Sequence, residues 1–255
     1  MDYGMVNVPA AAVRKKAKHT SEMTNQLLFG EFARIIKEKD GGWIKIRSLH
    51  DDYEGWTRDN LLLEVTAKEA KIVPEYVTTE TANTIRFKEM ILQVPMGSSL
   101  PGFADGKGMI AGQSYILDGK YRKRNEQHPD NELIKHLAFP WLNAPYLWGG
   151  RTQFGVDCSG FVQVIFKMMG IDMPRDAWQQ AQKGKTVNKL KEAVCGDLAF
   201  FDDKEEIVHV GMLLNNEQII HSSGKVRIDA IDKKGIVHSD TGKYTHRLRA
   251  IKRGW

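Results

Sequence analysis

The sequence has few cysteines and no long apolar run, and each shortage excludes a class of protein. Only Cys158 and Cys195 occur in 255 residues, too few for a disulfide scaffold and without the paired clusters that a structural zinc needs. No run approaches the roughly 18 apolar residues of a membrane span, and the first residues lack the layout of a secretion signal. We therefore expect a soluble protein with no membrane partner, cytoplasmic as the sequence stands and in the cell envelope if the natural N-terminus is longer.

Motifs for phosphate, metal and nucleic-acid binding are also missing. There is no Gly-rich loop of the Walker or dinucleotide type and no pair of His or carboxylate residues at ligand spacing, so we expect no cofactor and no metal. The net charge is +5, but the densest basic run, at 15–18, is short and most other bases alternate with acids. This pattern favours a solvated surface over a nucleic-acid groove.

The hydrophobic content and the length of the chain are sufficient for several folded domains. Hydrophobic residues make up 42% of the chain, and the length fits two or three compact units. Short apolar segments between Gly and Asp turns fill the first half, which predicts small antiparallel barrels. We assign one barrel to 1–65, a second, divergent barrel to 66–128 and a third domain to 129–255, with a polar linker at 122–130.

The third domain changes in pattern from turns and strands to helices followed by strands. A helix is predicted over 132–142, capped by Asp130 or Asn131, and helical spacing of apolar residues predicts another over 161–169. Apolar runs then indicate strands at 198–201, 207–214 and 218–221. This order predicts an α+β domain with the helices first.

Cys158 is the candidate nucleophile. It lies at or just before the N-terminus of the predicted helix, where the helix dipole and unpaired N–H groups favour the thiolate by lowering the thiol pKa. Gly149 and Gly150 precede it, and a Gly-Gly loop allows a ligand to approach the backbone. The alternative is a small buried apolar residue, which is how we interpret Cys195.

His209 and His221 are the candidate base and its orienting partner, because each interrupts an apolar strand. Asn215 and Asn216 supply a turn between the strands, which predicts a hairpin. A three-residue loop would place both histidines on one face, where one ring can orient the other, whereas a two-residue loop would separate them. Each histidine could instead be an ordinary core residue.

Two resemblances to known families follow from these motifs. The segments Gly30-Glu31, Gly42 to Ile46 and Gly55-Trp56 resemble a bacterial SH3-like domain. The region 132–255 resembles the NlpC-type bacterial cell-wall cysteine peptidases through the following segments: Tyr146 to Gly150, Asp157 to Phe161, Pro174 to Asp176, Gly196 to Phe201, His209 to Gly211 and Ile220-His221. The expected fold is therefore an α+β papain-like cysteine peptidase domain preceded by two small all-β SH3-like barrels.

The second resemblance implies a reaction and residue roles. It implies a monomeric endopeptidase that hydrolyses the γ-D-glutamyl-L-diamino acid bond of murein stem peptides, with Cys158 as nucleophile, His209 as base and His221 as third catalytic residue. It also implies that Tyr146 helps to bind the oxyanion and that Trp148, Asp157 and Ser159 line the substrate cleft. Trp148 could instead pack under the sheet, and Asp157 could serve only as a helix cap.

SH3-like barrels before this domain resemble a subgroup that trims free murein peptides during recycling. The matching segments would offer Glu22 and Asp176 as carboxylates and Tyr53 as a hydroxyl to the free ammonium of an N-terminal L-Ala. The alternative is that Glu22 and Tyr53 are ordinary surface and Asp176 is a helix cap. Rival functions are an acyltransferase or amidase on the same scaffold, or a wall-binding module with little activity.

Overall fold

The fold is known from a computed structural model, which describes residues 1–255 except 88, 125–129 and 255. The chain divides into two compact units, the first made of Met1–Glu126 with Trp148–Gln153 and the second of Gln127–Leu147 with Phe154–Trp255. The short segment Trp148–Gln153 therefore belongs with the N-terminal unit, although it lies in the second half of the sequence. None of the helices in the described ranges is long and apolar enough to cross a membrane.

The first unit begins with a seven-stranded antiparallel sheet in the order β3-β2-β6-β5-β4-β1-β7. Its strands alternate between buried and exposed positions, as in β2, where Ala11 and Val13 are fully buried and their neighbours are not. The short antiparallel strands expected for this part of the chain are present. The strands are β1 (Tyr3–Val6), β2 (Ala10–Arg14), β3 (Met23–Leu28), β4 (Phe32–Lys39), β5 (Trp43–Ser48), β6 (Glu54–Arg58) and β7 (Leu62–Val65).

The rest of the first unit consists of two smaller sheets that share a core with the first sheet. Met5, Phe29 and Phe32 of the first sheet region cluster with buried residues such as Phe87 and Tyr115. The sheets have the orders β10-β9-β14-β13-β12 and β11-β8-β15. Their strands are β8 (Tyr76–Thr78), β9 (Asn83–Phe87), β10 (Met90–Val94), β11 (Ser99–Leu100), β12 (Phe103–Ala104), β13 (Lys107–Ile110), β14 (Gln113–Asp118) and β15 (Tyr121–Lys123). The later segment of this unit contains β16 (Arg151–Thr152), which is in neither of these sheets.

A close backbone approach joins these sheets. Gly30 has a φ of 78°, and a Cβ built there would lie 2.0 Å from the carbonyl oxygen of Ser99. Only glycine tolerates both the positive φ and the contact. The linker predicted over 122–130 is wrong at its start, because Arg122 and Lys123 pair with β8 in β15; residues 125–129 lie outside the described residues.

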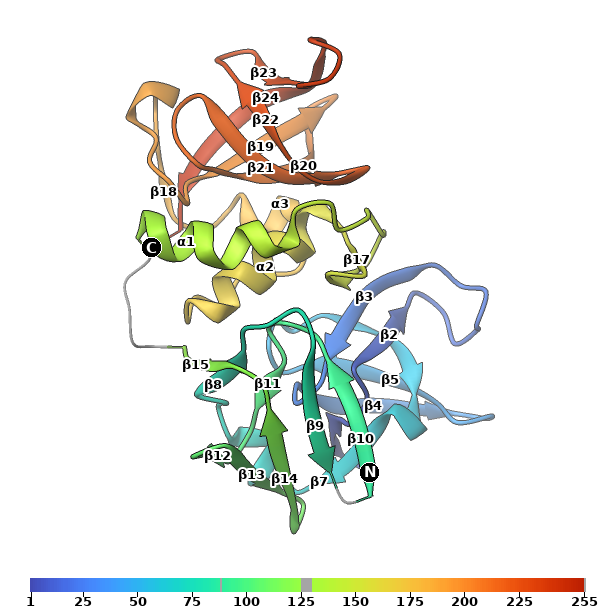
Figure 1. The fold of residues 1–255 in the computed structure, drawn as a ribbon. Helices are drawn as coiled ribbons and strands as arrows, with labels where there is room; N and C mark the ends of the chain where they lie inside the picture. Colours follow the sequence, from blue (N-terminus) through green and yellow to red (C-terminus); the bar gives the residue numbers. More distant parts are fainter. Residues whose placement is uncertain (88, 125–129, 255) are drawn as a thin grey trace. The chain divides into compact units, whose positions relative to one another are not determined.

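The second unit places three helices before a seven-stranded sheet of order β18-β24-β19-β20-β21-β22-β23, in which β24 also pairs with β23. Figure 1 shows α1, α2 and α3 on one side of this sheet, and α2 packs on β20 and β21. The predicted order of helices before strands is confirmed, although strands dominate the unit. The elements are α1 (Asn131–Ala138), α2 (Cys158–Met168), α3 (Ala177–Gln180), β17 (Gly155–Val156), β18 (Lys185–Thr186), β19 (Leu198–Asp203), β20 (Glu206–Leu213), β21 (Gln218–Ser223), β22 (Lys225–Ile231), β23 (Gly235–Val237) and β24 (Tyr244–Arg253).

The helix predicted over 132–142 is shorter than expected. It runs over Asn131–Ala138, and Asp130 caps it by accepting a 2.7 Å hydrogen bond from the Leu133 N–H. A 3₁₀ turn over Phe139–Trp141 follows, with Pro140 at its start. Proline lacks an N–H and its ring clashes with the preceding turn, so it ends the α-helix there.

Candidate active site

Cys158 is the first residue of α2, and Asp157 is the N-cap that places it there. An Asp157 carboxylate oxygen accepts a 2.8 Å hydrogen bond from the backbone N–H of Gly160, which fixes the start of the helix. Every residue of α2 is buried, and Cys158 itself is 7% exposed. The predicted position of this cysteine at a helix N-terminus is thus confirmed.

The pKa of the Cys158 thiol is raised, whereas its position at a helix N-terminus had suggested a lowered pKa. Burial, together with the neighbouring Asp157 carboxylate, raises the pKa of Cys158 to about 12. Hydrogen bonds from the backbone N–H groups of Val210 and Ser159 and the charge of Arg175 act in the opposite direction but are outweighed. In the substrate-free protein the helix terminus is therefore not enough to ionise the thiol, and a base must take its proton.

His209 on β20 and His221 on β21 lie on the same face of the hairpin and contact each other. Leu213 pairs with Ile219, and the Leu214 N–H donates to the Gln218 carbonyl oxygen at 2.9 Å, so residues 215–217 form a three-residue loop. The two histidines therefore share one face, as the three-residue alternative predicted. His209 Nε2 lies 2.8 Å from His221 Nδ1, a hydrogen-bonding distance. The next residue of β20, Val210, donates its backbone N–H to the Cys158 sulfur, so His209 is adjacent in sequence to a residue that contacts the thiol.

The His209 imidazole is buried beside two other histidines. Burial lowers the pKa of His209 well below its ordinary value, and the charges of His221 and His246 lower it further. The ring of His246, from β24, stacks on it with centroids 4.2 Å apart and an interplanar angle of 23°. His209 is therefore a neutral ring at neutral pH, able to accept a proton.

Asp229 on β22 is a member of this cluster that the sequence analysis missed. Its Oδ2 lies 3.0 Å from His221 Nε2, and both side chains are 1% exposed. Arg227, two residues earlier on the same strand, lies 2.9 Å from the same oxygen through Nε. The available signal was an acid within an apolar strand next to the histidine strand, the same kind of interruption that identified the histidines.

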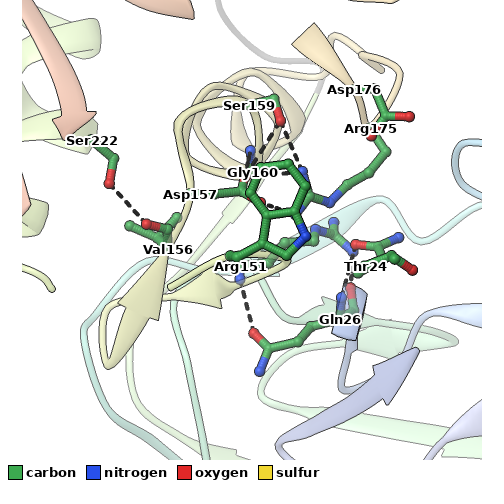
Figure 2. Close-up of polar contacts among 12 residues, drawn as sticks. Thr24, Gln26, Arg151, Val156, Asp157, Ser159, Gly160, Arg175, Asp176 and Ser222 are labelled. Carbon is green, nitrogen blue, oxygen red and sulfur yellow. Dashed lines mark hydrogen bonds and ion pairs between the residues drawn. The ribbon is translucent and has the colours of Figure 1, made fainter. Parts of the chain in front are cut away.

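A second buried network surrounds the start of α2 (Figure 2). Arg175 donates to both oxygens of Asp157, at 3.0 and 2.6 Å, and to the Ser159 hydroxyl at 2.9 Å. The arginine side chain is 1% exposed and the aspartate side chain 7%. Asp157 and Ser159 thus bind Arg175, a residue that the sequence analysis did not select, and their predicted contact with substrate stays a prediction.

Tyr146 lies just before this region in the chain. Its backbone forms a bridge to Val156, whose carbonyl oxygen also accepts a 2.8 Å hydrogen bond from the Ser222 hydroxyl (Figure 2). Burial raises the pKa of Tyr146 well above its ordinary value, and the charges of Cys158 and Asp157 add to this effect. The phenol therefore stays protonated at neutral pH and can donate a hydrogen bond.

In the first unit, Glu22 and Trp148 contact each other. The indole Nε1 donates to a Glu22 carboxylate oxygen at 2.9 Å, while Trp148 is 59% exposed. Trp148 is therefore not packed under a sheet. Tyr53 is half-buried against the core of the first sheet.

The segment that carries Trp148 is fixed inside the first unit by Arg151. Its guanidinium donates to both oxygens of Glu31, at 2.8 and 2.9 Å, and to the carbonyl oxygen of Gln26 at 2.8 Å. Gly149 approaches β3 so closely that a Cβ would lie 2.6 Å from the Met23 carbonyl oxygen. Both contacts explain why this segment belongs to the first unit.

Asp176 is the N-cap of α3 and forms a capping box with Gln179. The Asp176 N–H donates to Gln179 Oε1 at 3.3 Å. Among the described residues, no group of three or more His, Cys, Asp or Glu is placed to hold a metal ion.

Two family models match parts of this chain. Residues 143–244 match the NlpC/P60 family, and residues 13–61 match the bacterial dipeptidyl-peptidase SH3 domain. The first match contains Tyr146, Cys158, His209 and His221. The second match covers most of the first sheet, whereas neither match extends to the two smaller sheets.

Relatives and solved structures agree with these matches. A γ-D-glutamyl-L-lysine dipeptidyl-peptidase of Bacillus subtilis is 31% identical over 213 residues, covering 77% of this chain and 71% of the relative. The protein of the same name from Bacillus cereus is 28% identical, over 80% of this chain and 68% of its own. The crystal structure of an NlpC/P60 family protein from Bacillus cereus shares the fold, with a TM-score of 0.81, 21% identity and 99% of each chain covered.

Proposed function

Because the chain belongs to the NlpC/P60 family of cysteine peptidases that act on peptidoglycan, we propose that it hydrolyses the γ-D-glutamyl-L-diamino acid bond of murein peptides. The names of the two Bacillus relatives support this bond, since both are γ-D-glutamyl-L-lysine dipeptidyl-peptidases. The observation that carries the proposal is the 2.8 Å contact between His209 and His221, on a hairpin whose Val210 N–H donates to the sulfur of a cysteine at a helix N-terminus. That arrangement supplies a nucleophile, a base and a group that orients the base.

In the proposed reaction, the Cys158 sulfur attacks the γ-carbonyl carbon of D-glutamate while His209 takes the thiol proton. The negative charge that develops on the carbonyl oxygen is stabilised by the Cys158 backbone N–H and the Tyr146 hydroxyl. His209 then protonates the departing amine of the diamino acid, which leaves a thioester on Cys158. Water activated by His209 hydrolyses the thioester and regenerates the thiol.

Burial of both groups suits a proton transfer that accompanies the attack. A neutral thiol with a pKa near 12 and an imidazole with a depressed pKa do not form a stable ion pair before substrate binds. Proton transfer from Cys158 to His209 therefore belongs to the attack step itself. The hydrogen bond to His221 supports the charge that His209 gains in that step.

A defined tripeptide tests the proposed bond. L-Ala-γ-D-Glu-L-Lys and the matching diaminopimelate peptide are incubated with the protein, and the products are identified by mass spectrometry. We expect the dipeptide L-Ala-γ-D-Glu and the free diamino acid. An intact peptide, or cleavage of another bond, would contradict the proposal, and a transfer product with an added amine in place of the free acid would identify an acyltransferase.

We further propose that the enzyme prefers peptides with a free N-terminal L-Ala. Glu22 supports this preference, because its exposed carboxylate is held by Trp148, two residues after Tyr146 in the chain. Tyr53 and Asp176 remain predicted partners of the same ammonium. A charge-assisted hydrogen bond contributes about 1.5–3 kcal/mol, so losing the positive charge should lower kcat/KM roughly tenfold to a hundredfold.

Acetylation of the substrate tests the preference. N-acetyl-L-Ala-γ-D-Glu-L-Lys should be cut more slowly than the free peptide, and Glu22→Gln should slow only the free peptide. Glu54→Gln serves as the matched control, because Glu54 is an acid of the first unit paired with Lys45 and Arg47. Equal turnover of the two peptides by the unaltered enzyme would refute the preference while leaving the proposed bond intact.

A further inference from the structure

Asp229 is a buried carboxylate that contacts donor groups of three residues. Oδ1 accepts hydrogen bonds from the Ser239 N–H at 2.8 Å and from an Arg227 NH2 group at 3.0 Å. Oδ2 lies 3.0 Å from His221 Nε2 and 2.9 Å from Arg227 Nε. Burial by itself raises the pKa of Asp229, but the hydrogen bonds from His221, Ser239 and Arg227 outweigh it and hold the pKa well below the usual range. The group is therefore a carboxylate that only accepts.

A carboxylate in this place fixes the protons on both histidines. Since Asp229 only accepts, His221 Nε2 must carry the proton that it shares with Oδ2. In a neutral ring the other nitrogen then has no proton, so His221 Nδ1 must accept from His209 Nε2 across their 2.8 Å contact. His209 Nδ1 is left with a free lone pair.

We propose that Asp229 is a positioning residue that sets the tautomers of His221 and His209 and so leaves His209 Nδ1 as the nitrogen that takes the thiol proton. The proposal rests on the proposed function, in which His209 is the base for Cys158. It adds that the His209 nitrogen that acts as the base is determined by Asp229 on β22, which lies two hydrogen bonds away. Neither the sequence motifs nor the hairpin of β20 and β21 specifies which nitrogen is free.

Replacement of Asp229 by asparagine should move the proton of each histidine ring to its other nitrogen. The amide oxygen stays at the Oδ1 position, because the Ser239 N–H and an Arg227 NH2 group both donate there, whereas Arg227 Nε lies 2.9 Å from the Oδ2 position without forming a hydrogen bond. The amide NH2 then faces His221 Nε2 and donates to it. His221 would carry its proton on Nδ1 and donate to His209 Nε2, which moves the His209 proton to Nδ1 and blocks the base.

Nuclear magnetic resonance can read the tautomers directly, without substrate. In a Cys158→Ala background labelled with ¹⁵N, long-range ¹H–¹⁵N spectra should show the Nε2–H form for both His209 and His221. The added Asp229→Asn change should convert both rings to the Nδ1–H form. Nδ1–H rings in the background protein, or unchanged rings after the Asn substitution, would overturn the proposal.

Kinetics supply a second reading that a purely structural role would not produce. Asp229→Asn should lower kcat by about 100- to 10,000-fold with little change in KM, because a wrong tautomer disables the base but leaves binding intact. Asp229→Ala, which imposes no wrong donor, should lower kcat less than the isosteric Asn. A structural role predicts the opposite order, so a smaller loss for Asn than for Ala would refute the tautomer argument.

The matched control is Asp240→Asn. Asp240 is exposed and accepts from the same Arg227 at 3.1 Å, but it does not contact His221 in the hydrogen bonds of the described residues. We expect kcat within about twofold of the unaltered enzyme, as for other exposed ion pairs. If the unaltered enzyme fails to cut the tripeptide, the proposed function is wrong, whereas the tautomer spectra still decide the role of Asp229.

Discussion

The ion pair between Arg151 and Glu31 offers a stability prediction that the structure makes quantitative. The Arg151 side chain is 0% exposed and that of Glu31 is 2% exposed, and two hydrogen bonds of 2.8 and 2.9 Å join them. Glu31 also accepts from the Leu28 N–H at 3.0 Å. Glu31→Gln keeps the shape of the side chain but leaves a buried guanidinium without its countercharge. Breaking a buried pair in this way costs about 3–5 kcal/mol.

Urea unfolding measures this loss. With a slope of about 2 kcal/mol per molar urea, the unfolding midpoint of the first unit should fall by about 1.5–2.5 M in Glu31→Gln. Circular dichroism and tryptophan fluorescence should report the same shift. Replacing both partners with apolar residues, as in Glu31→Leu with Arg151→Met, should recover most of the loss, because no buried charge remains unpaired.

An exposed pair in the same unit serves as the control. Glu54 pairs with Lys45 and Arg47 at 2.6 Å each, but its side chain and that of Arg47 are 33% and 47% exposed. Water screens this pair, so Glu54→Gln should cost less than about 1 kcal/mol. If Glu31→Gln lowers the free energy of unfolding as little as Glu54→Gln does, then burial does not make the Arg151–Glu31 pair more stabilising than an exposed pair, and the reasoning is refuted.

Three further predictions concern the active site. Cys158→Ala should abolish hydrolysis of the tripeptide, while Cys195→Ala, at a buried position near Lys135 and Glu132, should retain it. Activity in the first variant would contradict the proposed nucleophile. His209→Ala should be as inactive as Cys158→Ala, whereas His221→Gln, which can still accept a hydrogen bond, should keep measurable turnover in a steady-state assay. Because burial raises the thiol pKa to about 12, the thiolate fraction grows with pH, so iodoacetamide labelling of Cys158 should still be accelerating above pH 9; a plateau below pH 8 would show an ionised thiol.

Local patterns in the sequence were sufficient to predict several elements of the site. Helical spacing after Cys158 and a polar residue before it predicted the helix start, and the structure places the cysteine there. The interrupted apolar strands identified His209 and His221, and the structure selects the three-residue loop of the two that were left open. These features depend on residues close in sequence, so the periodicity of a single helix or hairpin reveals them.

Other features depend on residues that the sequence separates. Arg175 reaches Asp157 from 18 positions later, and Arg151 reaches Glu31 across 120 positions. The smaller sheets share a core with the first sheet, although their segments were assigned to a separate barrel. The periodicity of a single segment does not predict such contacts, because they form only when elements distant in sequence pack together.

The sequence by itself determined the position of Cys158 at a helix start, the histidine hairpin and the family to which the chain belongs. Only the tertiary structure decided the protonation state of the site. Packing of α2 under β20 buries the thiol and raises its pKa, although the helix terminus alone would lower it. The placement of β22 beside β21 brings Asp229 to His221. Charge states depend on burial and on neighbours in space, and both are properties of the folded chain rather than of its local sequence.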